Sequence, residues 1–290
     1  MVDSVYLNIE GIYIYQILMF YNIFIKYDKR NYFKYKYKNV IFNYFKSSKS
    51  LYIRTEADKI IGRRIVTLED KKEFWDKLIT IIMEFVDIKR EDIKFKLCRI
   101  DYKVDLQLTP LEMSNIFTLL NKHRTRFKYL KSTRKYKTSI SLSGHSAGAK
   151  INIYDKGEQS HLPEWKDVLR IEWQVKNRKL HRLLKINGIE RDINLYWTKE
   201  FMEEFYFKYY EEYLYLGKYY KLGKAKEIIE NSSYTKTIKK GLLNFIDDVN
   251  KYGMTRGSKK YSYNTTRRYV SYLNELNVNP VTLNDNCKID

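Results

Sequence analysis

Three short segments of the sequence place a charged or hydroxyl-bearing side chain at every second position. In chain order they carry Arg99, Asp101, Lys103 and Asp105; Lys150, Asn152, Tyr154 and Lys156; and Arg170, Glu172, Gln174 and Lys176. A tyrosine hydroxyl accompanied by lysines, arginines and carboxylates is the mixture that a metal-assisted attack of tyrosine on a phosphodiester needs. These segments are therefore the first candidates for a reactive site.

Each residue type in this mixture has a chemical reason to be there. A phenol has a pKa of about 10 and is a poor nucleophile at neutral pH, so Tyr154 needs a nearby positive charge, which Lys156 could supply. Asp101 and Glu172 could hold Mg²⁺ or Mn²⁺, hard cations that prefer oxygen ligands. Asp105 is a further candidate ligand, or a salt-bridge partner. The metal would polarise the scissile phosphate for in-line attack.

The alternation itself predicts the elements that position these side chains. A period of two places Ile100, Ile151 and Ile171 on one face of their strands and the polar positions on the other. The three strands are thus expected in one antiparallel sheet, with a core on one side and a polar site on the other. Any half-exposed strand alternates in this way, however, so a merely solvated outer face is the competing interpretation.

The composition indicates a polyanionic partner. The 290 residues include 55 Lys and Arg against 35 Asp and Glu, a net charge of +20, and nucleic acid is the commonest partner of such a chain. A bias toward Tyr, Lys, Asn and Ile also arises from A+T-rich coding sequence. The only cysteines, Cys98 and Cys287, provide neither a disulfide framework nor zinc-ligand spacing, which favours a reducing, cytoplasmic location.

One uncharged stretch, Gly11 to Ile25, is too short to span a bilayer and lacks a basic segment before it. We expect it to form a buried strand or hairpin, and we expect no membrane association.

Two basic runs, residues 26–38 and 122–137, are either contacts for the DNA backbone or solvated surface. The candidate DNA-binding residues are Arg99, Lys150, Arg170, Arg124, Arg126, Arg267 and Arg268. For Arg99 and Arg170, an ion pair with a neighbouring carboxylate is the alternative. His145, in a glycine-rich turn, is a candidate ligand or a solvated side chain, and Glu158 is a weaker acidic candidate.

The order of elements predicts an α+β protein. Strands are expected at 4–9, 40–45, 51–55 and 94–107, with a hairpin formed by 138–143 and 149–156. Helices are expected from Thr67, with Asp70 completing its cap, and from Pro110 to about 121, capped by Thr109. Beyond residue 196 the pattern is helical, over 198–216, 235–252 and 265–276. We divide the chain into a nicking domain, 1–190, and a helical segment, 191–290, that binds DNA or supports the first domain.

In combination and in this order, the motifs Arg99-Ile100-Asp101, Tyr154-x-Lys156 and Arg170-Ile171-Glu172 resemble those of rolling-circle replication initiators. The pattern is similar to the filamentous-phage gene II replication proteins, including the continuation into 176–180 (KNRKL), and to plasmid Rep_trans initiators. The resemblance implies an antiparallel sheet of RRM-like or HUH-like character. It also implies that Tyr154 is the nucleophile, Asp101 and Glu172 are the acidic residues, and Lys156 assists. The sequence lacks a His-hydrophobic-His pair, as those relatives do.

The function implied by this resemblance is initiation of rolling-circle replication at a plasmid or phage origin. Metal-dependent nicking would leave a 5′-phosphotyrosine and a free 3′-OH, with origin DNA, a host helicase and a polymerase as partners. The main alternative is a non-catalytic origin-binding or copy-control protein with the same basic surface. A conjugative relaxase would share the chemistry, whereas a tyrosine recombinase lacks support because its Arg…His-x-x-Arg…Tyr order is missing.

Overall fold

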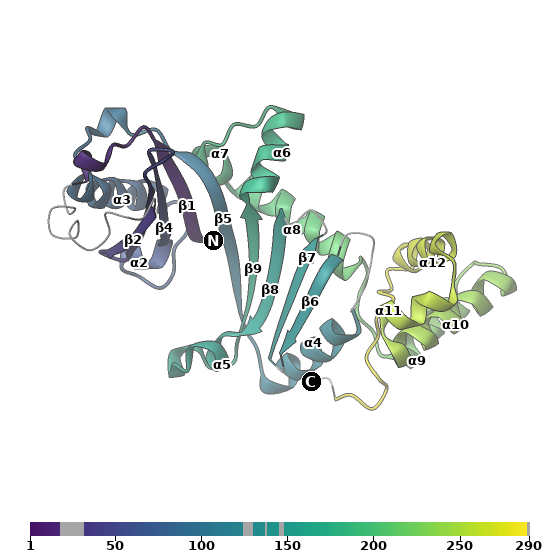
Figure 1. Cartoon of the computed structure of the whole chain (residues 1–290). Helices are drawn as coiled ribbons and strands as arrows, with labels where there is room; N and C mark the ends of the chain where they lie inside the picture. Colours follow the sequence, from purple (N-terminus) through teal and green to yellow (C-terminus); the bar gives the residue numbers. More distant parts are fainter. Residues whose placement is uncertain (18–31, 124–129, 137, 145–147, 289–290) are drawn as a thin grey trace. The chain divides into compact units, whose positions relative to one another are not determined.

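Alternating strands and amphipathic helices build an α+β chain (Figure 1). The computed structural model describes residues 1–17, 32–123, 130–136, 138–144 and 148–288. Within these ranges the strands form a sheet with the order β2-β3-β4-β1-β5-β9-β8-β7-β6. Every helix in the same ranges is too short or too polar to traverse a bilayer. The chain divides into two units: residues 1–104, 146–150 and 172–203 form unit 1, and residues 105–145, 151–171 and 204–290 form unit 2.

The N-terminal strands of unit 1 pair antiparallel. They are β1 (Val2–Glu10), β2 (Tyr32–Tyr37), β3 (Val40–Phe45), β4 (Ser50–Glu56) and the greater part of β5 (Lys96–Gln107). Lys38 and Asn39 connect β2 to β3 with positive φ angles of 41° and 66°, as a two-residue hairpin requires. The three strands predicted before residue 56 are therefore confirmed, and part of the first basic run forms β2.

Helices cover one face of this sheet. These helices include α2 (Ala57–Ile61) and α3 (Lys71–Phe85). Two further helices, α6 (Asn177–Asn187) and α7 (Ile193–Tyr196), belong to the same unit. Phe85 of α3 stacks on Phe42 of β3 with ring centroids 3.9 Å apart. Side chains alternate along a strand, so Ile41 and Asn43, which flank Phe42, face the other side of the sheet.

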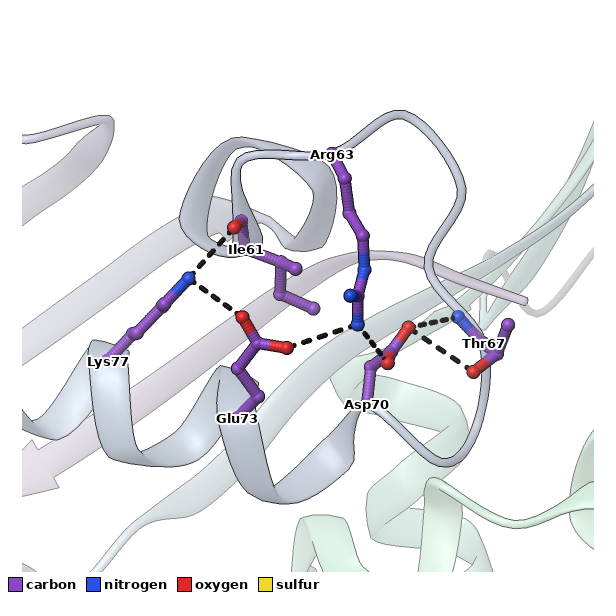
Figure 2. A network of polar contacts seen from close by, with 6 residues as sticks. All are labelled: Ile61, Arg63, Thr67, Asp70, Glu73 and Lys77. Atoms are coloured by element: carbon purple, nitrogen blue, oxygen red, sulfur yellow. Dashed lines mark hydrogen bonds and ion pairs between the residues drawn. The ribbon is translucent and has the colours of Figure 1, made fainter.

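The connection from α2 to α3 differs from the prediction. Figure 2 shows Arg63 pairing with Asp70 and Glu73, while Lys77 bridges Glu73 and the carbonyl of Ile61. The Asp70 carboxylate accepts from the Thr67 backbone N–H at 2.7 Å, as the capping pattern predicted. The helix nevertheless begins at Lys71, so the predicted start at Thr67 was wrong: residues 67–70 form a turn that these side chains close.

The uncharged stretch after β1 is also not a strand where it is described. Its first residues form a short 3₁₀ helix, η1 (Ile14–Gln16), while Ile12 and Ile17 are buried. The remainder, residues 18–25, lies outside the described residues. Another short 3₁₀ helix of unit 1 is η3 (Arg90–Asp92).

The first helix of unit 2 is α4 (Pro110–Lys122), which starts where the sequence predicted. The Thr109 hydroxyl accepts from the Glu112 backbone N–H at 3.2 Å, and the Glu112 carboxylate accepts from the Thr109 N–H at 2.7 Å. Strands β6 (Leu130–Tyr136) and β7 (Ser139–Gly144) pair antiparallel, and β8 (Ala149–Asp155) follows. β7 and β8, the two strands of the predicted hairpin, are neighbours in the sheet, and part of the second basic run forms β6.

Beyond β8, β9 (Val168–Lys176) is the last strand among the described residues. Besides α6 and α7, the helical elements that follow β8 are α5 (Lys156–Ser160), η4 (Pro163–Trp165), α8 (Lys199–Leu214), α9 (Leu222–Glu230), α10 (Lys236–Tyr252), α11 (Met254–Gly257), η5 (Ser258–Lys260) and α12 (Tyr263–Glu275). Leu242, Phe245 and Ile246 of α10 pack with Ile229 and Leu273 in a buried cluster. The predicted helices after residue 196 are confirmed.

Candidate active site

Tyr154 lies at the end of β8, where the strand passes directly into a helix. Asp155 caps α5 by accepting from the Glu158 backbone N–H at 3.0 Å. Lys156 is consequently the first residue of α5 and not a further strand residue, which corrects the predicted strand end. The Tyr154 side chain is mostly covered, with 8% of the residue exposed.

The lysine remains close to the tyrosine despite this change of element. Lys156 Nζ lies 5.9 Å from the centre of the Tyr154 ring and 5.7 Å from that of Trp165. It also donates a hydrogen bond of 2.9 Å to Gln159. A cation at this distance from a ring is attracted by the negative face of the π-system and places positive charge beside the phenol.

A second cation approaches Trp165 from β9. Arg170 Cζ lies 4.8 Å from the centre of the Trp165 ring. The same guanidinium donates from Nε to Asp105 Oδ1 at 2.6 Å and from Nη2 to Oδ2 at 2.8 Å. Arg170 is thus buried, oriented by a bidentate ion pair and in contact with an aromatic ring. Tyr154, Lys156, Trp165, Arg170 and Asp105 make up the unit 2 cluster.

The other predicted residues of the three strands belong to unit 1. Arg99 donates from Nε to Asp101 Oδ1 at 2.7 Å and from Nη2 to Oδ2 at 2.6 Å, and the Ser4 hydroxyl donates to Oδ2 at 2.8 Å. Burial raises the pKa of Asp101 and outweighs the lowering by Arg99 and Ser4. Burial lowers the pKa of Arg99, but the hydrogen bonds and charge of Asp101 outweigh burial and raise it, with a further contribution from the charge of Glu172. Glu172 itself is partly exposed. Lys150 is partly buried.

The charged face of β5 is more enclosed than the alternation predicted. Asp101 is buried, and Lys103 is only 1% exposed, with its Nζ 2.8 Å from Asp3 of β1. The expectation of an open polar face was therefore wrong at these two positions, because β1 supplies partners that cover them.

The carboxylates do not form a divalent-cation site in this arrangement. Both oxygens of Asp101 accept from Arg99, and both oxygens of Asp105 accept from Arg170. Across the part of the chain that the structure describes, no three His, Cys, Asp or Glu side chains converge as metal ligands. These residues therefore do not fit Mg²⁺ or Mn²⁺ as they stand, and metal dependence stays a prediction from the sequence.

The remaining candidates are dispersed. Arg267 and Arg268 are exposed on α12, and Glu158 is exposed on α5. Arg124, Arg126 and His145 lie outside the described residues. Trp165 was missed by the sequence analysis; the only signal for it was its position shortly before the Arg170 strand.

The comparisons with known proteins give little similarity. No family model matches the chain, and no curated protein matches it. Among solved structures, a rolling-circle replication initiator protein from Geobacillus stearothermophilus superposes with a TM-score of 0.34 and 12% identity, over 64% of this chain and 77% of that chain.

Proposed function

We propose that this chain nicks one strand of DNA with Tyr154 as the nucleophile, and thereby initiates rolling-circle replication at an origin. The observation that carries the proposal is the proximity of Lys156 to Tyr154. The sequence resemblance requires a lysine two residues after the tyrosine, and its Nζ lies 5.9 Å from the tyrosine ring even though a helix begins between them. The net charge of +20 suits a DNA substrate.

In the proposed step, the Tyr154 oxygen attacks a backbone phosphorus and forms a phosphotyrosine with the 5′ end of the cut strand. The bond from phosphorus to the 3′ oxygen breaks, the phenol loses its proton, and the 3′ oxygen takes up a proton. Lys156 would stabilise the phenolate and the negative charge that develops on the phosphoryl oxygens. The phosphotyrosyl bond retains the energy for rejoining, since the free 3′-OH can later attack it.

Arg170 has a supporting role in this proposal. Its bidentate pair with Asp105 fixes the guanidinium, and contact with Trp165 places it in the same cluster as Lys156. A fixed cation loses little side-chain entropy when it meets a phosphate. We assign Arg170 to positioning the cluster and not to the chemical step.

A nicking assay tests the proposal. Supercoiled plasmid carrying the DNA that flanks the coding sequence would be incubated with the full chain and Mg²⁺, Mn²⁺ or EDTA, and covalent adducts would be resolved on a denaturing gel. We expect a nick and a 5′ adduct that disappear in Tyr154→Phe. Tyr252→Phe, an exposed tyrosine on α10, is the matched control and should nick normally. The EDTA arm tests the predicted metal dependence in the same experiment.

A DNA-binding protein without cleavage activity is the second candidate, favoured by the burial of Tyr154. A phenol that is 8% exposed must be uncovered before it can reach a phosphate. If the wild-type chain binds the plasmid tightly but forms no nick and no adduct under any of the three conditions, this second function replaces the first.

A further inference from the structure

The face of the unit 1 sheet opposite α3 carries a cavity of about 400 Å³. Its polar lining comes from six strands and the start of α6, and consists of Tyr6, Lys34, Asn43, Tyr52, Arg54, Arg99, Lys176 and Asn177. We call this cavity the sheet groove. Its volume lies in the lower part of the range of about 300–1,000 Å³ for small-molecule pockets, roughly enough for one nucleotide.

Strand register explains why these side chains meet. Tyr6 of β1 lies opposite Arg54 of β4 on one side and opposite Arg99 of β5 on the other. The two guanidinium carbons lie 5.1 Å and 4.5 Å from the centre of the Tyr6 ring. Directly opposite residues share a face of the sheet, so the row Arg54–Tyr6–Arg99 is built into the hydrogen-bonding pattern.

A second row extends the groove toward the edge of the sheet. Lys34 of β2 lies opposite Asn43 of β3, which in turn lies opposite Tyr52 of β4. Tyr52 is 39% exposed, so its ring is accessible. The sheet groove therefore presents two tyrosine rings, each with cations or amide groups in line beside it.

Positive charge dominates the lining. Lys34, Arg54, Arg99 and Lys176 contribute cations, and no carboxylate lines the cavity in the part of unit 1 that the structure describes. The acids nearby are Asp101, bonded to Arg99, together with Glu56 and Glu172, whose charges act on Tyr6 and Arg99 respectively.

The groove cations also affect one another. The pKa of Lys176 is lowered by burial and further by the positive charge of Arg99, while Asp101 opposes the shift. A bound anion would relieve this repulsion. Lys34 and Arg54 have no ion-pair partner among the described residues, so their charges are available to a ligand.

We propose that the sheet groove binds an unpaired nucleotide of single-stranded DNA, with Arg54 on its phosphate and the rings of Tyr6 and Tyr52 as stacking surfaces for its base. Aromatic rings interleaved with cations on an open sheet face are suited to a strand whose bases are unstacked from a partner strand. A duplex presents its bases only by their edges, so it cannot use the two rings. This inference is independent of the chemistry proposed for Tyr154.

Fluorescence anisotropy with a labelled oligothymidylate of about a dozen nucleotides tests the inference, using the full chain carrying Tyr154→Phe so that no covalent product forms. Because stacking contributes about 1–3 kcal/mol per base, Tyr6→Leu should weaken binding about tenfold, whereas Tyr6→Phe should change it less than about twofold. Tyr52→Leu, at an exposed position, supplies the same test with little risk to folding.

The charge is tested separately. Arg54→Gln should reduce the slope of log K against log salt by about 0.7, the value for one phosphate contact to single-stranded nucleic acid. Arg90→Gln is the matched control: its guanidinium pairs with Asp76 of α3 and does not line the groove, so the slope should stay unchanged.

Several results would overturn the inference. One is equal binding by Arg54→Gln and Arg90→Gln; another is unchanged binding by both leucine variants. A third is a duplex of the same length that binds as tightly as the single strand and responds equally to Arg54→Gln. Displacement of the oligonucleotide by equimolar thymidine monophosphate would identify a free nucleotide, and not a DNA strand, as the ligand.

Discussion

Replacing Asp101 with Asn tests whether its carboxylate stabilises the fold or binds a metal ion. In the structure the carboxylate accepts two hydrogen bonds from Arg99 and one from Ser4, and its side chain is 3% exposed. Asn keeps the shape but loses the charge, and it presents an amide NH₂ to donors that need an acceptor. Arg99 would then carry an uncompensated charge in a partly buried position.

The expected cost follows from this geometry. Removing one partner of a buried ion pair destabilises a protein by about 3–5 kcal/mol. Because 24% of the Arg99 side chain is exposed, water screens part of its charge, and we expect the lower end, about 3 kcal/mol. That is a large share of a total stability of about 5–15 kcal/mol.

Urea denaturation of the full chain, followed by circular dichroism, measures this loss. Asp101→Asn should unfold at a clearly lower urea concentration, and adding Arg99→Gln should restore part of the stability because the orphaned charge is removed. Glu172→Gln, at a partly exposed position, should cost less than about 1 kcal/mol. An Asp101→Asn chain that unfolds at the wild-type midpoint yet no longer nicks DNA would refute the reasoning and restore a direct role in the reaction.

Three further predictions concern unit 2. Burial lowers the pKa of His123 to about 3, whereas in the unfolded chain its pKa has the ordinary value of about 6.5. Between these two pH values the unfolded chain binds a proton at His123 that the folded chain does not. The free energy of unfolding is therefore unaffected above pH 6.5 and falls by up to about 1.4 kcal/mol per pH unit as the pH is lowered toward 3. His123→Gln should reduce the slope of stability against pH in urea titrations between pH 6 and 4, and an unchanged slope would contradict this. Gly217→Ala should destabilise the chain by more than about 2 kcal/mol in thermal melts, because φ is +96° and the added Cβ would lie 2.5 Å from the Val278 carbonyl carbon. Thr109→Ala should cost about 1 kcal/mol in urea denaturation through loss of the α4 cap, while Thr109→Ser should keep it.

The sequence predicted elements whose signals are local. Thr109 followed by Pro110 defines the start of α4, and Thr235 defines the start of α10, where its side chain accepts from the Ile238 N–H. Capping depends on residues within one turn, so a short window contains all the information. Strand alternation is equally local, and β1, β3, β4 and β5 were recognised from it.

Features that depend on distant partners were not predictable. The distant partners of Asp101 and Lys103 are Ser4 and Asp3 of β1, which lie about a hundred residues earlier and meet β5 only because β1 pairs with it. The sequence therefore predicted charged residues on one face of β5 correctly, but could not show that the face is covered. The row of Arg54 and Arg99 about Tyr6 was missed for the same reason.

Tyr6 and Tyr154 are proposed to act on DNA in different ways, so their effects on binding and on cleavage can be measured separately. Tyr6 lies between two arginines in a cavity, so its ring can act as a surface without any change of protonation. Tyr154 has a lysine beside it and must lose its proton to react. If both assignments hold, Tyr6→Leu raises the DNA concentration needed for half-maximal nicking and leaves the rate at saturation unchanged, because stacking acts in the bound ground state. Tyr154→Phe does the opposite: it eliminates the adduct and leaves the affinity intact. A Tyr6→Leu chain that loses adduct formation at saturating DNA would show that the sheet groove takes part in the reaction itself.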